Sequence, residues 1–269
     1  MSDIRLELTD WNPLDPTRLL VCLDGVQATG MRPGGQISKA LQERHPLINS
    51  HYEGFNRRKF VYEIYAWICN HVGTVTFIGM SAGALLAHDV IEYAKSQGTK
   101  IERFEIILLD ALTGLRDMVD QNAQVVPFLP PIPLPASINH RIFGSDDKIE
   151  HEEGLSETAR AELDEHIRRS HNFSFRSWVQ QVRYPVMHRG PRRDVLEGVD
   201  MVSIVSQEDK LVRQPGAHQH WEEAAGREIY QIAAESPGHC FILEYPTTYL
   251  NTILAALDHL EEMRRAAVQ

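Results

Sequence analysis

The sequence predicts an α/β protein whose doubly wound sheet is mostly parallel. The continuous apolar run at residues 19–23 is typical of a strand that is buried on both faces, and residues 104–109, apolar except for Glu105, predict another strand. Between such runs, apolar residues recur at helical spacing, as at Phe60, Ile64 and Ile68. Because strands that alternate with helices form parallel sheets, this pattern predicts the architecture of the first half of the chain.

The other expected elements follow in order along the chain. Residues 3–9 alternate and predict an edge strand. Further strands are expected at residues 47–49, 74–78, 199–205 and 228–233. Helices are expected around residues 37–41, 60–68, 84–91 and 156–170, the last with Ser156 as its N-cap. A closing helix is expected after Pro246, with Thr247 or Thr248 as its N-cap.

The alternation of strands and helices stops between residues 109 and 199. Five prolines lie within residues 127–135, and proline blocks both a helix and a central strand. We therefore expect a core at residues 1–112, a largely helical lid or cap insertion at residues 113–197, and the rest of the core at residues 198–269. Phe173, Phe175 and Trp178 of this insertion either contact a substrate or pack the lid on the core.

The segment Gly79-Met80-Ser81-Ala82-Gly83 reads G-x-S-x-G between a predicted strand and a predicted helix. In such a sharp turn the strand and the helix pass close together, so the residues on either side of the serine must lack bulk. The amino end of the following helix directs N–H groups and a positive dipole toward Ser81, where negative charge would develop. The pattern predicts that Ser81 is a nucleophile, although a surface turn can contain the same five residues by chance.

With this motif the chain resembles proteins of the α/β-hydrolase fold, in which nucleophile, acid and histidine follow in that order. Asp209, in the turn after the strand at residues 199–205, matches the place of the acid, with Asp110 and Glu208 as alternatives. Gly238-His239, followed by Cys240 and Phe241, matches the histidine loop of this family. The resemblance therefore implies a catalytic triad of Ser81, Asp209 and His239.

Each of these residues has a chemical role. Ser81 is a weak nucleophile until His239 accepts its proton, and Asp209 would hold the imidazole tautomer. The backbone N–H of Ala82 would bind the oxyanion, together with that of Gly25 or Val26 in the loop after the strand at residues 19–23. Many relatives have a histidine where this chain has Asp24, which places a carboxylate near the expected oxyanion hole.

The resemblance implies a serine hydrolase that cleaves an ester or thioester of a small-molecule acyl substrate through an acyl-enzyme, with no cofactor and no metal. Amide hydrolysis, C–C bond hydrolysis and acyl transfer stay open, because a fold does not fix a substrate. A serine at the elbow argues against the epoxide hydrolases and haloalkane dehalogenases, which use aspartate there. A ligand-binding protein without catalytic activity is the alternative from a different class.

The composition limits the partners of the chain. The 269 residues carry a net charge of −10 and no long basic patch, which disfavours a nucleic-acid partner. We expect a cytoplasmic protein without a membrane partner, because the sequence has no signal peptide and no run of 18 apolar residues. Cys22, Cys69 and Cys240 are expected to be reduced thiols, and the oligomeric state is left open. His218 and His220 are too few for a metal site and too close in sequence to share one helix face.

Overall fold

A computed structural model describes residues 4–8, 17–25, 35–52, 56–118, 151, 153–171, 175–209, 211–236, 238–239 and 242–268. The strands are β1 (Ile4–Leu8), β2 (Arg18–Leu23), β3 (Leu47–Tyr52), β4 (Thr74–Met80), β5 (Arg103–Leu109), β6 (Asp200–Ser206) and β7 (Tyr230–Ala234). The helices are α1 (Gln36–Gln42), α2 (Arg57–Ile68), α3 (Gly83–Ser96), the 3-10 helix η1 (Leu115–Asp117), α5 (Glu157–His171), α6 (Phe175–Met187), α7 (Arg193–Leu196), α8 (Gln214–Ala225) and α9 (Pro246–Val268).

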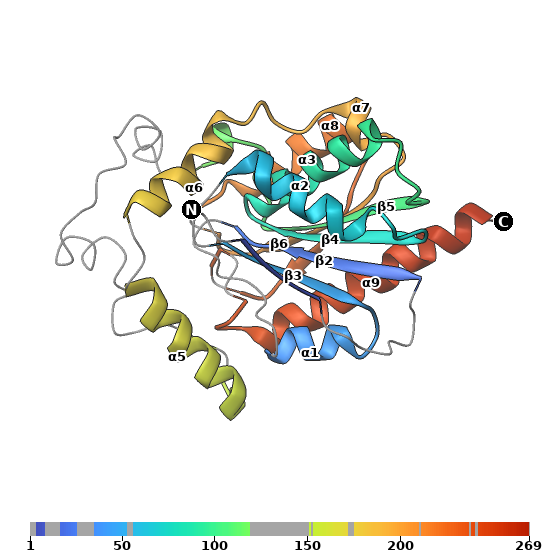
Figure 1. Ribbon diagram of the computed structural model, residues 1–269. Coiled ribbons are helices and arrows are strands. Elements are labelled where there is room, and N and C mark those ends of the chain that lie inside the picture. Colours follow the sequence, from blue (N-terminus) through green and yellow to red (C-terminus); the bar gives the residue numbers. More distant parts are fainter. Residues whose placement is uncertain are drawn as a thin grey trace.

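The strands form one seven-stranded sheet in the order β1-β3-β2-β4-β5-β6-β7 (Figure 1). All neighbours are parallel except β1, which runs antiparallel to β3 at the edge of the sheet. All seven residues of β4 are buried, as expected for a strand between β2 and β5 with helices on both faces. The predicted fold class, a mostly parallel doubly wound sheet, is confirmed.

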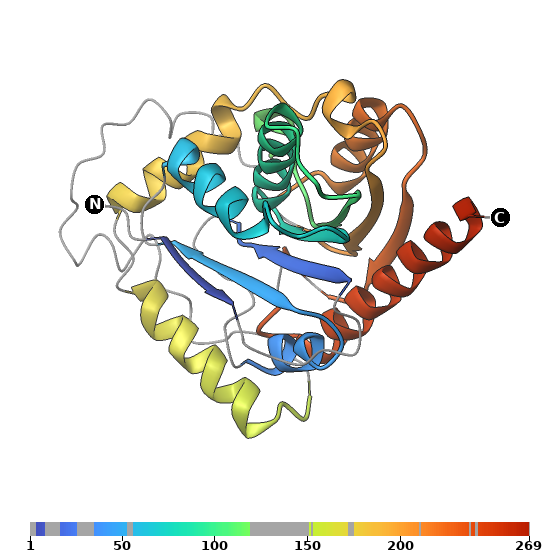
Figure 2. The same ribbon diagram turned by 45° about the vertical axis from the view of Figure 1, so that its right-hand side comes forward.

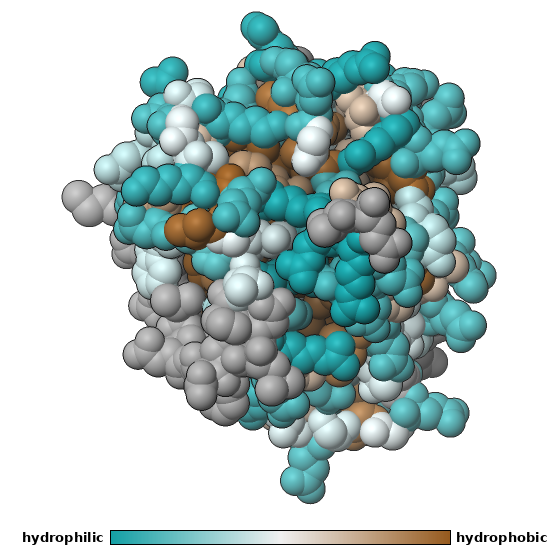
Figure 3. All heavy atoms as spheres, turned by 90° about the vertical axis from the view of Figure 1, so that its right-hand side faces the viewer, coloured by the Kyte–Doolittle hydropathy of each residue, from teal (hydrophilic) through white to brown (hydrophobic). Residues whose placement is uncertain are grey.

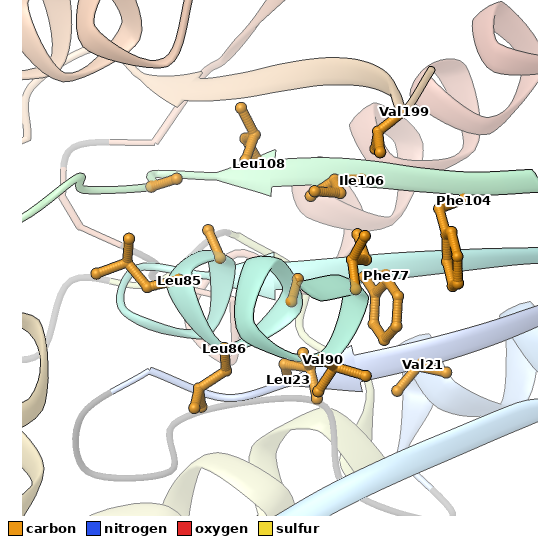
Figure 4. Packing of buried hydrophobic residues seen from close by; sticks show 14 of the residues in the cluster. Val21, Leu23, Phe77, Leu85, Leu86, Val90, Phe104, Ile106, Leu108 and Val199 are labelled. Carbon is orange, nitrogen blue, oxygen red and sulfur yellow. The ribbon is translucent and has the colours of Figure 1, made fainter. Parts of the chain in front are cut away.

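Helices cover both faces of the sheet (Figures 1 and 2). Helices α2, α3, α7 and α8 bury apolar side chains in one cluster, and α1 and α9 bury theirs in a second cluster on the other face. Alternation along β2 separates the two clusters, because Val21 and Leu23 belong to the first and Leu20 and Cys22 to the second. The first cluster includes the side of α3 that faces β2, β4 and β5 (Figure 4), so the helix after the elbow is fixed to the centre of the sheet.

Several predicted boundaries differ from the structure, and two of the differences have a clear physical reason. Strand β3 continues to Tyr52 because β1 pairs with it from Ile48 to Tyr52, Ile4 lying opposite Tyr52, and local sequence does not reveal this partner. The closing helix begins at Pro246 itself, so the expected N-cap at Thr247 or Thr248 is wrong. Proline suits the first helical position, since the N–H that it lacks has no partner there.

The region expected to form the lid contains α5 and α6 in its described part. The N-cap of α5 is confirmed, because the hydroxyl of Ser156 accepts a hydrogen bond from the N–H of Ala159 (3.1 Å). Leu163 of α5 packs in the cluster on the α1 and α9 face, and Tyr184 of α6 packs in the cluster on the α3 face. The domain boundaries stay a prediction, and the proline-rich stretch and Phe173 lie outside the described residues.

The face of the molecule in Figure 3 is mostly hydrophilic, with apolar side chains visible in small patches between polar ones. Among the described helices, none combines the length and the apolar character that crossing a lipid bilayer requires. The longest, α9, has 23 residues that include charged side chains such as Asp258, Glu262 and Arg265.

Candidate active site

The turn between β4 and α3 holds Ser81 in an unusual backbone conformation. Its φ of 51° lies in the left-handed region, which costs free energy for a residue with a side chain. The N–H of Ser81 donates to the carbonyl oxygen of Leu109 at the end of β5 (2.8 Å), which ties the turn to the neighbouring strand. Such strain is typical of the nucleophile elbow that the sequence motif predicts.

The two glycines of the motif are required by close packing on both sides of Ser81. A Cβ atom at Gly79 would lie 2.6 Å from the Cα atom of Ala84 in the following helix. A Cβ atom at Gly83 would lie 2.1 Å from the carbonyl oxygen of Leu23 at the end of β2. Neither contact is sterically possible, so the glycines allow β4, α3 and β2 to meet at Ser81.

Two of the expected oxyanion-hole residues lie beside the serine. Ala82 is the N-cap of α3, where backbone N–H groups have no partner within the helix. Gly25 follows β2, and a Cβ atom there would lie 3.0 Å from Cβ and 3.6 Å from Oγ of Ser81. Val26 lies outside the described residues.

Asp24, the departure from the family pattern, is buried, with 3% of its surface exposed. Burial raises the pKa of the Cys22 thiol well above 9.0, and the charge of Asp24 adds to this effect. Cys22 packs in the cluster on the α1 and α9 face of the sheet. The carboxylate of Asp24 therefore acts electrostatically on that side of β2.

Asp209 and His239 form a buried pair beyond the carboxyl ends of β6 and β7. Nδ1 of His239 lies 2.7 Å from Oδ2 of Asp209, whose side chain is 1% exposed. Oδ1 of Asp209 accepts the N–H groups of Leu211 (2.8 Å) and Val212 (2.9 Å), and the amide of Gln214 donates to Oδ2. Because these donors fix the carboxylate, they also fix the imidazole that it contacts.

The contact between Asp209 and His239 shifts the pKa of each residue. Burial alone would lower the pKa of His239, but the hydrogen bond and charge of Asp209, together with the charge of Asp110, raise it above 6.5. Burial alone would raise the pKa of Asp209, but the hydrogen bond and charge of His239 and the amide of Gln214 lower it below 3.8. With its proton on Nδ1 facing Asp209, the neutral imidazole has its lone pair on Nε2, as a general base requires.

The structure also brings the alternative acid to this place. Asp110 directly follows β5, and one of its carboxylate oxygens, one of Asp209 and a ring nitrogen of His239 all lie within 4.8 Å of one another. Glu208, the other alternative, is exposed. Ser206 and Tyr249, which hydrogen-bond with Asp110, were not predicted, because neither stands in a recognisable motif.

A second cluster of histidines and an acid, His88, Asp89 and His188, lies on α3 and after α6. The N–H of Arg192 donates to Nε2 of His88 (3.1 Å), and the N–H of Gly190 donates to Nδ1 of His188 (3.0 Å). The other nitrogen of each ring must therefore carry the proton that it directs at Asp89, and it offers no lone pair to a metal.

This second cluster ties α6 and the residue that follows it to α2 and α3. Arg57 of α2 donates twice to the carboxylate of Asp89 (2.6 and 2.7 Å), and the hydroxyl of Tyr184 of α6 donates to it (2.6 Å). A buried carboxylate with this many donors stays ionised, and these hydrogen bonds with His188, Arg57 and His88 lower its pKa despite its burial. The cluster thus joins α2, α3 and α6.

His218 and His220 of α8 have separate partners. His218 lies 3.3 Å from Glu222 on its own helix, and His220 lies 2.6 Å from Asp117 in η1. The two rings therefore serve different contacts, as the sequence spacing predicted. Cys22 and Cys69 are free thiols, and Cys240 lies outside the described residues.

The arrangement is that of the α/β-hydrolase fold, and solved structures with this fold match nearly the whole chain. MenH from S. aureus is similar with a TM-score of 0.63 and 13% identity, over 94% of this chain and 98% of that chain. The esterase RhEst1 from Rhodococcus sp. ECU1013 has a TM-score of 0.58 and 14% identity, over 94% of each chain. The type II thioesterase BorB from the borrelidin biosynthetic cluster has a TM-score of 0.56 and 17% identity, over 95% of this chain and 96% of that chain.

No protein-family model matches the chain, and no curated protein matches it in sequence. At these low identities, the solved structures show the fold that the sequence resemblance implied. The residues of the site and its chemistry rest on the geometry described above.

The packing at the elbow predicts the effect of a single methyl group. Gly83→Ala places a Cβ atom against the backbone carbonyl of Leu23, so we expect a loss of about 2 kcal/mol or more in the free energy of unfolding. Urea denaturation measures this loss. Gly216→Ala is the matched control, since a Cβ atom there meets nothing within 4 Å, and it should be neutral or slightly stabilising. Equal stability of the two variants would contradict the packing described for the elbow.

Proposed function

We propose that this protein is a serine hydrolase that cleaves an ester or thioester bond of a small-molecule substrate through an acyl-enzyme. The observation that carries the proposal is the buried Asp209–His239 pair beyond β6 and β7, in the same sheet as the strained Ser81 turn after β4. Parallel strands place their carboxyl ends at one edge, so the three residues share that edge.

In the proposed reaction, Oγ of Ser81 attacks the carbonyl carbon of the substrate while Nε2 of His239 takes its proton. The N–H groups of Ala82 and Gly25, or that of Val26, hold the negative oxygen of the tetrahedral intermediate. The bond to the leaving group breaks, and the leaving alcohol or thiol takes the proton from His239. Water then attacks the acyl-serine as His239 takes one of its protons, and His239 passes this proton to the departing Oγ of Ser81, which releases the carboxylic acid and restores the hydroxyl. Asp209 stays ionised and stabilises the imidazolium in both halves.

The substrate is proposed as a class of compound, an ester or a thioester. The similar structures include an esterase and a thioesterase, which supports an oxygen or sulfur leaving group over an amine. The insertion at residues 113–197 would cover the site and shape the acyl pocket. The reaction needs no metal and no organic cofactor, and we place it in the cytoplasm because the three cysteines fit a reducing compartment.

A fluorophosphonate probe tests the nucleophile. We expect one probe to label Ser81 in the folded protein, because His239 activates that hydroxyl, and p-nitrophenyl esters or thioesters should be hydrolysed. Ser81→Ala should abolish both signals, whereas Ser96→Ala, a change at a hydroxyl that donates to Tyr93, should leave both unchanged. A folded wild-type protein without labelling would favour a ligand-binding protein on the same scaffold.

The titration of His239 predicts the pH dependence of ester hydrolysis. Protonated imidazole cannot accept the proton of Ser81, so kcat/KM should fall about tenfold per pH unit on the acidic side of its pKa. Since the pKa of His239 is raised, the midpoint of this fall should lie above 6.5. A value of kcat/KM that stays constant down to pH 5 would remove His239 from the mechanism.

A further inference from the structure

Asp110 is a buried carboxylate close to the proposed triad, and its side chain accepts hydrogen bonds from Ser206 and Tyr249, which are not triad residues. It is fully buried, and its φ of 45° holds it in the left-handed region, as Ser81 is held one strand away. The N–H of Asp110 donates to the carbonyl oxygen of Ile204 on β6 (2.9 Å). The residue thus sits between the turn that carries Ser81 and the turn that carries Asp209, in a backbone conformation that only strong local contacts maintain.

The hydrogen bonds around Asp110 suit an ionised carboxylate. Oδ1 accepts the N–H of Ser206 (2.7 Å), and Oδ2 accepts its hydroxyl (2.7 Å). The hydroxyl of Tyr249 lies 2.7 Å from Oγ of Ser206 and 3.2 Å from Oδ2 of Asp110. Because Ser206 gives its only hydroxyl proton to Asp110, Tyr249 can donate to Ser206, and every proton of this chain then points toward the carboxylate. No proton on Asp110 itself is needed.

Two carboxylates therefore lie beside one imidazole. Asp209 contacts Nδ1 of His239 directly, and Asp110 is within 4.8 Å of the same group. Among the described residues, the phenol of Tyr249 on α9 is also titratable and lies 3.5 Å from the carbonyl oxygen of Gly238, and Glu244 follows His239 in the chain. The phenol is neutral at the pH at which imidazole titrates. Burial raises the pKa of Glu244 to about 6, although the N–H groups of Glu244 and Leu243 oppose this effect.

We propose that Asp110 is a second carboxylate of the site, a positioning residue that acts on His239 through its charge while Asp209 acts through its hydrogen bond. This inference rests on the proposed function and deepens it. The imidazolium that forms when Ser81 gives up its proton is stabilised by two negative charges, that of Asp110 from the turn after β5 and that of Asp209 from the turn after β6. Ser206 and Tyr249 keep Asp110 ionised without neutralising it, so its charge is present throughout the cycle.

The titration of His239, measured by NMR of its imidazole, tests this inference without any substrate. Asp110→Asn removes the charge and keeps the size of the side chain, so the pKa of His239 should fall by about one unit. The acidic limb of kcat/KM should move to lower pH by the same amount. Asp194→Asn, a matched change at an exposed carboxylate, should leave both midpoints in place. Glu244→Gln removes the other group that titrates in this range, and the fall caused by Asp110→Asn should persist in that background.

Ser206→Ala separates charge from structure. It removes the hydroxyl that donates to Oδ2 of Asp110 but leaves the carboxylate, the N–H of residue 206 on Oδ1 and the hydroxyl of Tyr249, which still favour the ionised form, so the pKa of His239 should stay or rise, opposite to the change in Asp110→Asn. An unchanged pKa in folded Asp110→Asn would overturn the inference, even in an active esterase. If Asp110→Asn does not fold, a fall in the pKa of His239 in Ser206→Ala would overturn it. A wild-type protein that hydrolyses no acyl substrate would overturn the proposed function instead, because the NMR titration does not depend on turnover.

Discussion

The strained turn at Ser81 is the constraint on which the site depends. A side chain in the left-handed region is unfavourable, and it persists here because the turn is fixed on three sides. Strand β2 approaches through the space left by Gly83, helix α3 approaches through the space left by Gly79, and β5 accepts the N–H of Ser81. The same contacts bring Gly25 and the amino end of α3 beside the serine. Backbone N–H groups and the hydroxyl of Ser81 thus meet at one point because three elements of the core are packed too tightly for any side chain at Gly79 or Gly83.

Buried charge is the second organising feature. Asp209 and Asp110 lie close together, which would be costly if either lacked donors. Each carboxylate accepts hydrogen bonds from its own set of donors. Those of Asp209 lie in the loop after β6 and at the first residue of α8, and those of Asp110 lie at the end of β6 and on α9. The imidazole of His239 lies beside both carboxylates, so its protonation state responds to both. The Asp89 cluster follows the same rule farther along α3, where donors from α2 and α6 keep a buried carboxylate ionised and hold α6 against α2 and α3.

Much of the fold could be predicted from the sequence, because apolar runs and helical spacing report burial directly. The elbow was the sharpest signal, since its two glycines reflect a steric requirement that the structure shows at Gly79 and Gly83. The family pattern favoured Asp209 as the acid over Asp110, but the sequence could not show that both lie beside the same histidine. Both follow a buried strand, and only the pairing of β5 with β6 shows that they reach the same imidazole. Ser206 and Tyr249 gave no signal in the sequence, because their role depends on contact with Asp110. This residue lies 96 positions from Ser206 and 139 positions from Tyr249 in the chain. The first turn of α9 was missed because Pro246 was taken for a boundary and not for the first helical residue.

The central claim is that Ser81 carries the acyl group of the substrate during turnover. Rapid quenching of the protein with p-nitrophenyl acetate in acid, followed by peptide mass spectrometry, measures this directly. The account predicts one acetyl group on the peptide that contains Ser81, in an amount that matches the initial release of p-nitrophenol. Release of p-nitrophenol with the acetyl group on another residue, or with steady turnover and no acetyl group on any residue at any quench time, would contradict it.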